Sequence, residues 1–396
     1  MASGREVVVL SGVRTAIGDY GGALKDVAPT ELSAQVIREA VKRAKVDAKE
    51  VGACVIGNVI HTEAKDMYLS RVAALKGGLP EDSTALTVNR LCGSGLQAIV
   101  SASQMITLGD ADVAVGGGVE SMSRGGYMMP SLRWGQRMSD GAVIDMMVGA
   151  LTDPFETVHM GITAENIAEK WKISRAQQDE FSVESHRRAI NAIEKGYFKD
   201  QILPVELKTR KGTTVFDRDE HPRADASLES LAKLRAAFKN DGSVTAGNAS
   251  GINDGAAAVV LMERAAAEKK GLKPMARLVS YGIAGVDPKV MGIGPVPAST
   301  KALARAGLKV EQMDVVESNE AFAVQALAVT CDLKLDPKKT NPNGGAVGLG
   351  HPIGATGAVL TVKALYELQR TGGKYALVTM CIGGGQGIAA VFERLH

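Results

Sequence analysis

The chain repeats one pattern of residues in its two halves, and this repeat constrains the fold more than any other feature. Residues 40–51 (AVKRAKVDAKEV) and 302–313 (ALARAGLKVEQM) match in apolar pattern over twelve positions without a gap. Each segment leads into a short predicted strand that ends in asparagine, at Asn58 and at Asn319. This shared order favours a tandem duplication, in which each half is one α/β unit.

The spacing after each asparagine also agrees between the halves. Cys92 follows Asn58 at nearly the same distance along the chain as His351 follows Asn319. A glycine-rich helix start follows each of them, and then a strand that runs into glycines. Strands that alternate with amphipathic helices indicate a mostly parallel sheet covered on both faces. Two such halves would bring the loops after their central strands into one crevice, where open α/β sheets bind ligands.

The strand and helix pattern breaks between residues 124 and 247. A stretch from 163 to 195 is polar and helical in character, and a loop-rich stretch follows it. Long insertions in compact domains usually carry function or contacts between subunits. The sequence therefore predicts an N-terminal half at 1–123 and 248–272, an inserted loop domain at 124–247, and a C-terminal half at 273–396.

The composition excludes several classes of protein. A net charge of +2 provides no field for a polyanion, and no basic run is interleaved with aromatic residues, so we expect no nucleic-acid partner. The N-terminus has four consecutive apolar residues after a charged pair, too few for a signal peptide. No apolar run approaches the length of a membrane span, so no membrane association is expected. Four separated cysteines without a CxxC pair indicate thiols, no metal site and a cytoplasmic location.

Cys92 is the candidate nucleophile. It stands in residues 88–99 (VNRLCGSGLQAI), where an apolar run ends, a glycine-rich turn follows and a helix begins. A helix N-terminus favours a thiolate, and such settings lower a cysteine pKa to about 3.5–7.5. The alternative is a small buried apolar residue beside a turn.

Three further residues lie where a predicted strand of the second half meets a turn. Taken singly, Asn319 could cap the helix after it, His351 could be a turn residue, and Cys381 could belong to the core. Together with Cys92 they indicate a reaction that also moves a proton at carbon, because a Cys–His pair makes a nucleophile and a second thiol can act as acid and base. The amide of Asn319 and the backbone N–H groups of Cys92 and Gly383 are the predicted donors to an enolate oxygen.

At these residues the sequence resembles the thiolase family, the acetyl-CoA acetyltransferases and β-ketothiolases. The likeness rests on six motifs in family order: VNRLCGSGLQAI (88–99), GGGVESMS (116–123), NASGINDGAA (248–257), NEAFA (319–323), NGGAVGLGHPIGATG (343–357) and CIGGGQG (381–387). The resemblance implies duplicated βαβαβαββ halves that form a five-layered αβαβα core, with a loop domain inserted in the first half. It implies closeness to the bacterial short-chain β-ketothiolases of polyhydroxyalkanoate synthesis.

The resemblance also implies a two-step reaction. Cys92 would take an acyl group as a thioester with His351 activating it, and Cys381 would deprotonate a second acyl-CoA, which attacks this acyl-enzyme. Run backwards, the same steps cleave a 3-ketoacyl-CoA. Asn319, through a water, and His351 would form one oxyanion hole, and the backbone of Cys92 and Gly383 the other. Coenzyme A and acyl-CoA are substrates, so no cofactor is expected.

Contacts to coenzyme A are carried over from the family in the same way. They fall on Leu151, His159, Met160, Arg223, Ser230, Phe238, Ser250, Met291 and Phe322. Arg223 is expected at the nucleotide end, because a guanidinium suits a phosphate. His159 and Met160 are expected to line the acyl pocket. The family forms dimers or tetramers, so we expect a homo-oligomer in which residues 124–149 make the tetramer contact.

Two alternatives stay open from the sequence. A decarboxylating ketoacyl synthase shares the fold, but it pairs its cysteine with two histidines or with His and Asn, and Cys381 argues against it. A non-catalytic acyl-CoA or lipid-binding module has no use for two reactive thiols. The physiological direction, the longest acyl chain, dimer against tetramer, and a redox disulfide between Cys92 and Cys381 stay open as well.

Overall fold

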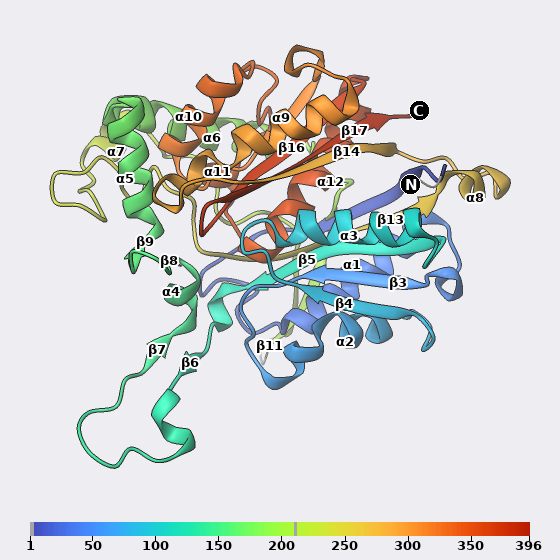
Figure 1. Cartoon of the computed structure of the whole chain (residues 1–396), viewed down its shortest axis with the longest axis horizontal. Helices are drawn as coiled ribbons and strands as arrows, with labels where there is room; N and C mark the ends of the chain where they lie inside the picture. The colour runs from blue at the N-terminus through green and yellow to red at the C-terminus, as the bar shows by residue number, and fades with distance from the viewer. Residues whose placement is uncertain (1–3, 210–211) are drawn as a thin grey trace.

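The computed structural model describes residues 4–209 and 212–396. Within them, eleven strands form one sheet (Figure 1): β1 (Val7–Thr15), β2 (Gly18–Asp19), β3 (Ala53–Gly57), β4 (Thr84–Val88), β5 (Val113–Ser121), β10 (Ile202–Leu203), β13 (Asn253–Glu263), β14 (Ala276–Gly285), β15 (Val315–Ser318), β16 (Tyr375–Ile382) and β17 (Gln386–Arg394). The longer helices are α1 (Pro29–Ala44), α2 (Leu69–Lys76), α3 (Ser94–Leu108), α5 (Met160–Trp171), α6 (Arg175–Glu194), α9 (Pro295–Ala306), α10 (Ala323–Leu333) and α12 (Ile353–Thr371).

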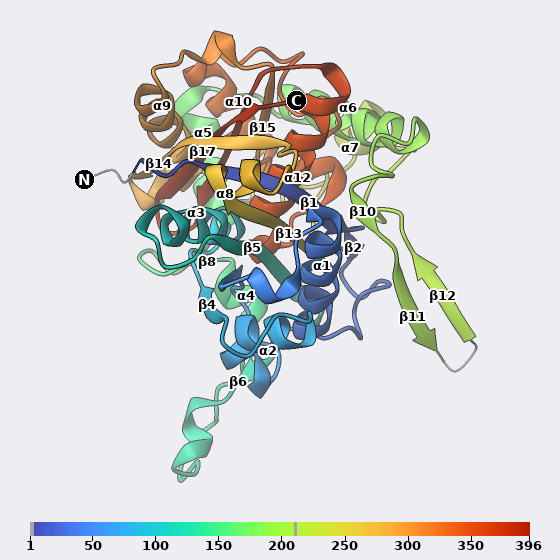
Figure 2. The same cartoon turned by 90° about the vertical axis from the view of Figure 1, so that its right-hand side faces the viewer.

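The shorter elements lie mostly in the inserted segment. They are β6 (Tyr127–Met128), β7 (Ile144–Asp145), α4 (Met146–Ala150), β8 (Thr152–Asp153), β9 (Val158–His159), β11 (Val205–Thr209), β12 (Gly212–Phe216) and α7 (Leu228–Ala232), with α8 (Arg264–Lys269) and α11 (Ala346–Leu349) outside it. The β6–β7 segment extends away from the body in Figure 1, and the β11–β12 hairpin projects in Figure 2.

The elements form the five layers that the resemblance implies. α1 and α2 cover the outer face of the N-terminal strands, and α9 and α10 cover that of the C-terminal strands. α3 and α12 lie between the two groups of strands and contact each other (Figure 1). β1 and β14 join the two groups through the pairs Val8–Arg277 and Val9–Ala276.

The predicted repeat is confirmed in the order of the elements. Residues 40–51 hold the end of α1 and a 3-10 turn that leads to β3, and residues 302–313 hold the end of α9 and a 3-10 turn that leads to β15. α3 begins two residues after Cys92, and α12 begins two residues after His351. Cys92 and His351 are therefore equivalent positions of the two halves.

The sheet is mixed, which corrects the expectation of a mostly parallel one. β3 pairs in parallel with β4 and β5, and β15 pairs in parallel with β16. β5 and β16, however, also have antiparallel neighbours, β13 and β17. Only residues 383–385 separate β16 from β17, and a connection this short permits antiparallel pairing alone.

The polar stretch from 163 to 195 is helical, as predicted, and it is divided between the two helices α5 and α6. α5 ends before Lys172, which adopts a left-handed conformation with φ 54°. Ser174 then caps α6: its hydroxyl accepts from the Gln177 N–H, while the Gln177 side chain accepts from the Ser174 N–H. This capping box restarts the helix in a new direction.

The segment Leu91–Leu108, which includes α3, is long and apolar enough to cross a membrane by length and composition, with a mean hydropathy of 1.2. This finding corrects the expectation that no apolar run has that length. In this fold 56% of the segment is buried. α3 packs against β3, β5 and α12, and a helix packed on several sides needs an apolar surface around most of its circumference.

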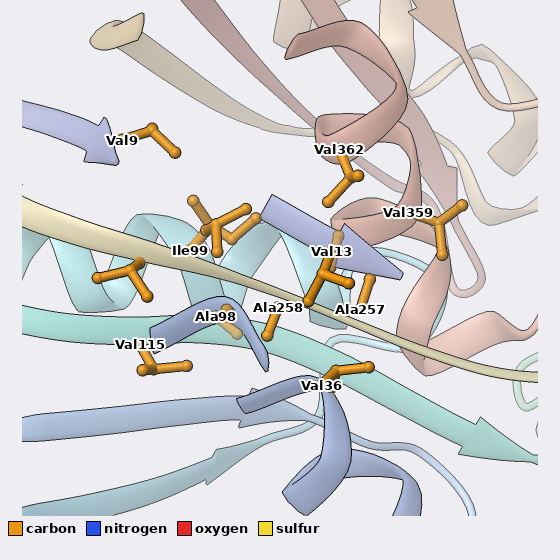
Figure 3. Close-up of a cluster of buried hydrophobic side chains, with 14 of the residues drawn as sticks. Val9, Val13, Val36, Ala98, Ile99, Val115, Ala257, Ala258, Val359 and Val362 are labelled. Atoms are coloured by element: carbon orange, nitrogen blue, oxygen red, sulfur yellow. The ribbon is translucent and has the colours of Figure 1, made fainter. Parts of the chain in front are cut away.

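Glycines let α3 and α12 meet through their backbones. A Cβ on Gly357 would lie 2.3 Å from the backbone nitrogen of Leu96, and one on Gly95 would lie 2.8 Å from the backbone of α12. The contact lies in a buried cluster of side chains from both helices and the strands around them (Figure 3). Because Cys92 and His351 precede these two helices, the close contact brings them near each other.

We expect Gly357→Ala to destabilise the protein, because the added methyl group meets the backbone of α3 rather than a side chain that can move. Overpacking of this kind costs about 1–3 kcal/mol. The free energy of unfolding in urea measures it. Gly126→Ala is the control, since a Cβ there has no atom within 4 Å, and its effect should stay within about 0.5 kcal/mol. Equal stability of the two variants would contradict the close helix contact.

Candidate active site

A cavity of about 410 Å³ lies where the two halves and the inserted segment meet. It is lined by Leu91, Cys92, Met122, Ala150, Leu151, His159, Met160, Ala237, Phe238, Ala246, Ala249, Ser250, Gly251, Ile252, Met291, Ala321, Phe322, His351, Ile353 and Gly383. An apolar wall with a few polar groups is the usual composition of a small-molecule site.

Most of the predicted site residues meet at this cavity. Its lining includes Cys92, His351 and Gly383, and also Leu151, His159, Met160, Phe238, Ser250, Met291 and Phe322. Asn319 and Cys381 are fully buried and lie behind the lining. Arg223 and Ser230 are exposed and lie outside it. The Ser230 hydroxyl donates to the Ser227 carbonyl at 2.9 Å, where α7 begins.

The turn before α3 places Cys92 at the cavity. Leu91 has φ 43°, a left-handed conformation that leucine rarely adopts. Asn89 Oδ1 accepts from the Leu91 N–H at 2.9 Å, and Ser94 Oγ donates to the Leu91 carbonyl at 2.6 Å. These two hydrogen bonds hold a strained backbone at the residue before the nucleophile, as is common at functional sites.

The expectation that the helix N-terminus makes Cys92 a thiolate is wrong for the free site. Burial raises the pKa of the Cys92 thiol to about 11, and the backbone N–H groups of Gly383 and of Cys92 itself offset this only in part. Removal from water penalises the charged form more than the helix end stabilises it. Cys92 is therefore a neutral thiol at pH 7 and needs a base.

His351 is arranged to be that base. Its Nδ1 lies 2.7 Å from Thr356 Oγ1, and the single hydrogen of this hydroxyl goes to the Pro352 carbonyl at 2.9 Å. Nδ1 must then carry the ring proton and donate it to Thr356, which leaves Nε2 as the acceptor. Burial lowers the pKa of His351 to about 4, so the ring is neutral at pH 7.

Asn253 holds the backbone of His351, and sequence reasoning did not single it out. Asn253 Oδ1 accepts from the His351 N–H at 2.8 Å. Gly350 has φ 100°, and a Cβ there would lie 2.5 Å from the Asn253 amide. Asn253 belongs to the motif at 248–257, so its place in that motif was the available signal. Its partner is 98 residues away, which no local pattern reveals.

Asn319 follows β15 and faces His351. Its Nδ2 lies 3.4 Å from His351 Nε2, and its N–H donates to the Thr379 carbonyl at 3.0 Å. Among the described residues its Oδ1 has no hydrogen-bond partner. Asn319 does not cap the next helix, because α10 begins at Ala323 after Phe322 as its N-cap.

Cys381 lies near the end of β16, beside the turn that holds Cys92. A Cβ on Gly93 would lie 2.7 Å from Ile382 Cδ1, which shows how closely that turn packs on β16. Burial raises the pKa of Cys381 far above its usual range, and the neighbouring Cys92 raises it further. The Cys381 thiol is therefore also neutral at pH 7 in the free site.

Glu320 has a structural role that sequence reasoning missed. Its buried carboxylate accepts from Ser185 Oγ at 2.6 Å, Asn341 Nδ2 at 2.8 Å and the Val347 N–H at 3.1 Å. It thus ties α6 and the 341–347 loop to the residue next to Asn319. Its partners Ser185, Asn341 and Val347 are 135, 21 and 27 residues away along the chain, so local sequence gave no sign of this role.

Three of the residues that line the cavity form a cluster of rings. The rings of His159 and Phe238 stack with centroids 4.5 Å apart, and Phe322 meets Phe238 edge to face at 6.3 Å. His159 Nδ1 accepts from the Gly161 N–H at 3.0 Å, so Nε2 carries the ring proton. Burial lowers the pKa of His159, which keeps this donor neutral.

All four cysteines are unpaired thiols: Cys54 and Cys381 are buried, Cys92 is half-buried and Cys331 is exposed. Among the residues that the structure describes, no group of three or more His, Cys, Asp or Glu side chains could hold a metal ion. The groups in or behind the cavity lining include the thiols of Cys92 and Cys381, the imidazoles of His159 and His351, and the amide of Asn319. Cys92 and His351 line the same cavity, and a neutral thiol can pass its proton to an imidazole whose Nε2 carries none as it attacks a carbonyl.

Two family models together match almost the whole chain. The model described as "Thiolase, N-terminal domain" matches residues 7–265, and "Thiolase, C-terminal domain" matches residues 272–394. The chain belongs to the thiolase family. This membership explains why six separate motifs occur in family order, and it makes the protein an acyltransferase of the thiolase type.

Individual relatives agree with this assignment. β-Ketothiolase BktB of Cupriavidus necator is 68% identical over 392 residues, which are 99% of this thiolase and 100% of the relative. The crystal structure of the Bacillus anthracis acetyl-CoA acetyltransferase has a TM-score of 0.98 at 49% identity, over 100% of both chains. Human mitochondrial 3-ketoacyl-CoA thiolase in complex with CoA has a TM-score of 0.97 at 45% identity, also over 100% of both chains. The thiolase fold is thereby confirmed.

In this thiolase, Thr356→Val should slow the alkylation of Cys92 by iodoacetamide by at least about tenfold. Valine keeps the shape of threonine but cannot accept from His351 Nδ1, so the ring proton is free to move to Nε2 and the base is lost. Mass spectrometry of the Cys92 peptide measures the rate. Thr356→Ser keeps the hydroxyl and serves as the control, with a rate close to that of the parent. A parent rate in Thr356→Val would contradict the assigned tautomer.

Proposed function

We propose that this thiolase is a β-ketothiolase, which joins acetyl-CoA with acetyl- or propionyl-CoA to give a 3-ketoacyl-CoA and CoA, and cleaves that product in reverse. The observation that carries the proposal is the placement of Cys92 and His351 in the lining of one apolar cavity, with the thiol of Cys381 buried close to that of Cys92. The names β-ketothiolase and acetyl-CoA acetyltransferase, given to its relatives, support the same activity.

In the first half-reaction Cys92 accepts the acyl group. Its Sγ attacks the thioester carbonyl while its proton passes to His351 Nε2, and the N–H groups of Cys92 and Gly383 stabilise the oxyanion. The bond to the coenzyme A sulfur then breaks. Cys381 protonates that sulfur, so CoA leaves as a thiol and Cys381 stays behind as a thiolate next to the imidazolium.

In the second half-reaction the Cys381 thiolate removes a proton from the α-carbon of a second acyl-CoA. His351 can donate to the enolate only while it is an imidazolium, because its Nδ1 proton is committed to Thr356. Asn319 supplies the second donor, through a water. The enolate attacks the acyl-enzyme, and the Cys92 thiolate that leaves takes its proton back from His351, so charges and protons balance.

This scheme disfavours both alternatives. A decarboxylating synthase forms its carbanion by losing CO₂ and needs no thiol at Cys381. A binding module needs neither the strained turn at Leu91 nor a histidine held in one tautomer by Thr356. Both features instead serve a nucleophile and its base.

Thiolases act on acyl-CoA and CoA, and we propose that the cavity is where this one binds them without a further cofactor. His159, Phe238, Ser250 and Met291 would face the pantetheine and acyl groups, and Arg223 would face the nucleotide outside the cavity. We propose that residues 124–247 form the loop domain for this contact, between halves at 1–123 with 248–272 and at 273–396.

A homo-oligomer is also proposed. β4 is the last strand at its end of the sheet, and Leu86 on this strand is 42% exposed. An open apolar edge is suited to pairing with a second copy. Trp134 and Met138, 87% and 85% exposed, lie on the projecting β6–β7 segment, which we assign to a tetramer contact (Figure 1). Sedimentation velocity tests the two contacts, at the β4 edge and at the β6–β7 segment. A monomer at micromolar concentration would contradict the proposal.

We further propose that the enzyme works in the cytoplasm and supplies short 3-ketoacyl-CoA for polyhydroxyalkanoate synthesis, within fatty acid metabolism. The support is the resemblance to short-chain β-ketothiolases and four thiols without a disulfide. Thiolysis rates on 3-ketoacyl-CoA of increasing length test the assigned chain length, because a preference for long chains would contradict it.

The parent enzyme should cleave acetoacetyl-CoA with CoA, and Cys381→Ala should reduce this kcat by about 10²–10⁴-fold while Cys92 still takes up an acetyl group. The reason is that this variant loses only the proton transfers at the α-carbon of the substrate and at the coenzyme A sulfur. Cys331→Ala, at the exposed cysteine, is the control and should keep the parent kcat. A parent kcat in Cys381→Ala would contradict the acid–base role, and no thiolysis by the parent would contradict the function itself.

A further inference from the structure

Glu120 is a buried carboxylate to which the proposed reaction gives no task. It lies in β5, is fully buried, and accepts four hydrogen bonds. Oε1 accepts from Asn58 Nδ2 and from the Ile60 N–H, both at 3.1 Å. Oε2 accepts from the Val59 N–H at 3.1 Å and from the Gly354 N–H at 2.9 Å.

A carboxylate is the only side chain of this size that satisfies all four donors. Each oxygen faces two N–H groups, so a glutamine would place its NH₂ against two of them whichever way the amide turned. Burial raises the pKa of Glu120, and the N–H donors oppose that shift. Because both oxygens already accept twice, an added proton would displace a donor, and the ionised form fits the site.

The four donors come from two different halves of the fold. Asn58 and the two residues after it follow β3 in the N-terminal half, whereas Gly354 is the second residue of α12 in the C-terminal half. The approach is close, since a Cβ on Gly354 would lie 2.5 Å from Glu120 Oε2. His351 lies three residues before Gly354. Through the Gly354 N–H, Glu120 therefore links the start of α12, just after His351, to the half that carries Cys92.

The duplication gives Glu120 a counterpart in the site. Glu120 follows Asn58 at the same spacing along the chain as Cys381 follows Asn319. In each half the asparagine follows one strand and the second residue lies in the parallel strand beside it. These strands are β3 and β5 for Asn58 and Glu120, and β15 and β16 for Asn319 and Cys381. At equivalent positions, one half thus carries the acid–base thiol, and the other carries a carboxylate that holds the start of the opposite half's helix.

We propose that Glu120 is a positioning residue of the thiolase reaction: it holds the start of α12, and with it His351, at the distance from Cys92 that proton transfer needs. The inference rests on the proposed function. Glu120 does not touch the reacting atoms and acts through the backbone of α12. Misplacement of a catalytic group by about 1 Å costs about 10²-fold in rate.

The test compares the parent, Glu120→Gln and Asp314→Asn. Asp314 is the control because its carboxylate also accepts backbone N–H groups, from Lys374 at 2.7 Å and Tyr375 at 3.1 Å, but does so next to the start of β15, away from Asn319. For each protein, circular dichroism checks the fold, thiolysis of acetoacetyl-CoA gives kcat and KM, and rapidly quenched acetylation by acetyl-CoA gives the rate at Cys92.

Glu120→Gln should lower kcat and the acetylation rate by about 10²-fold with KM almost unchanged, while Asp314→Asn keeps the parent values. A folded Glu120→Gln with the parent kcat would overturn the inference, as would a rise in KM with kcat unchanged. If the parent itself shows no thiolysis, the proposed function fails instead. If Glu120→Gln does not fold, Asn58→Ala replaces it in the test, because this variant removes one of the four donors to the Glu120 carboxylate. A lower kcat in Asn58→Ala would support the inference, and the parent kcat would overturn it.

Discussion

The contact between α3 and α12 is the constraint on which the rest of the structure depends. The two helices meet backbone to backbone at Gly95 and Gly357 in the middle layer, where any side chain would force them apart. Each helix starts just after a residue of the site, Cys92 in one half and His351 in the other. A single packing contact therefore sets the geometry of a nucleophile and a base that come from opposite halves of the sequence.

Burial then decides the charge state of the site. The same layers that exclude water raise the pKa of Cys92 to about 11 and lower that of His351 to about 4, so the pair is neutral before substrate arrives. Charge appears only as the proton moves to Nε2, in a site whose donors are already in place. Preorganised donors in a region without water stabilise developing charge more than solvent does. The site thus contains no buried ion pair at Cys92 and His351 until the reaction creates one.

Local apolar periodicity predicted the repeat and the helices and strands around it, and the spacing of the motifs singled out Cys92, Asn319, His351 and Cys381. The other cavity residues were predicted from the resemblance to thiolases. The sequence did not predict what depends on distant partners. Asn253 and Glu120 act through hydrogen bonds to residues far along the chain, and β5 pairs antiparallel with β13, which follows only after the whole inserted segment. The role of Thr356 was also missed, although its partners His351 and Pro352 are only five and four residues away. The pKa of Cys92 was predicted in the wrong direction, since helix position is visible in sequence and depth of burial is not.

The central claim is that Cys92 carries the acyl group while Cys381 does not. The most direct measurement incubates the parent enzyme with acetyl-CoA, quenches it in acid, digests it with pepsin and locates the acetyl group by mass spectrometry. The account predicts one acetyl group, on the peptide that contains Cys92, and its release when free CoA is added before the quench. An acetyl group on Cys381, or no labelling of Cys92, would contradict the account.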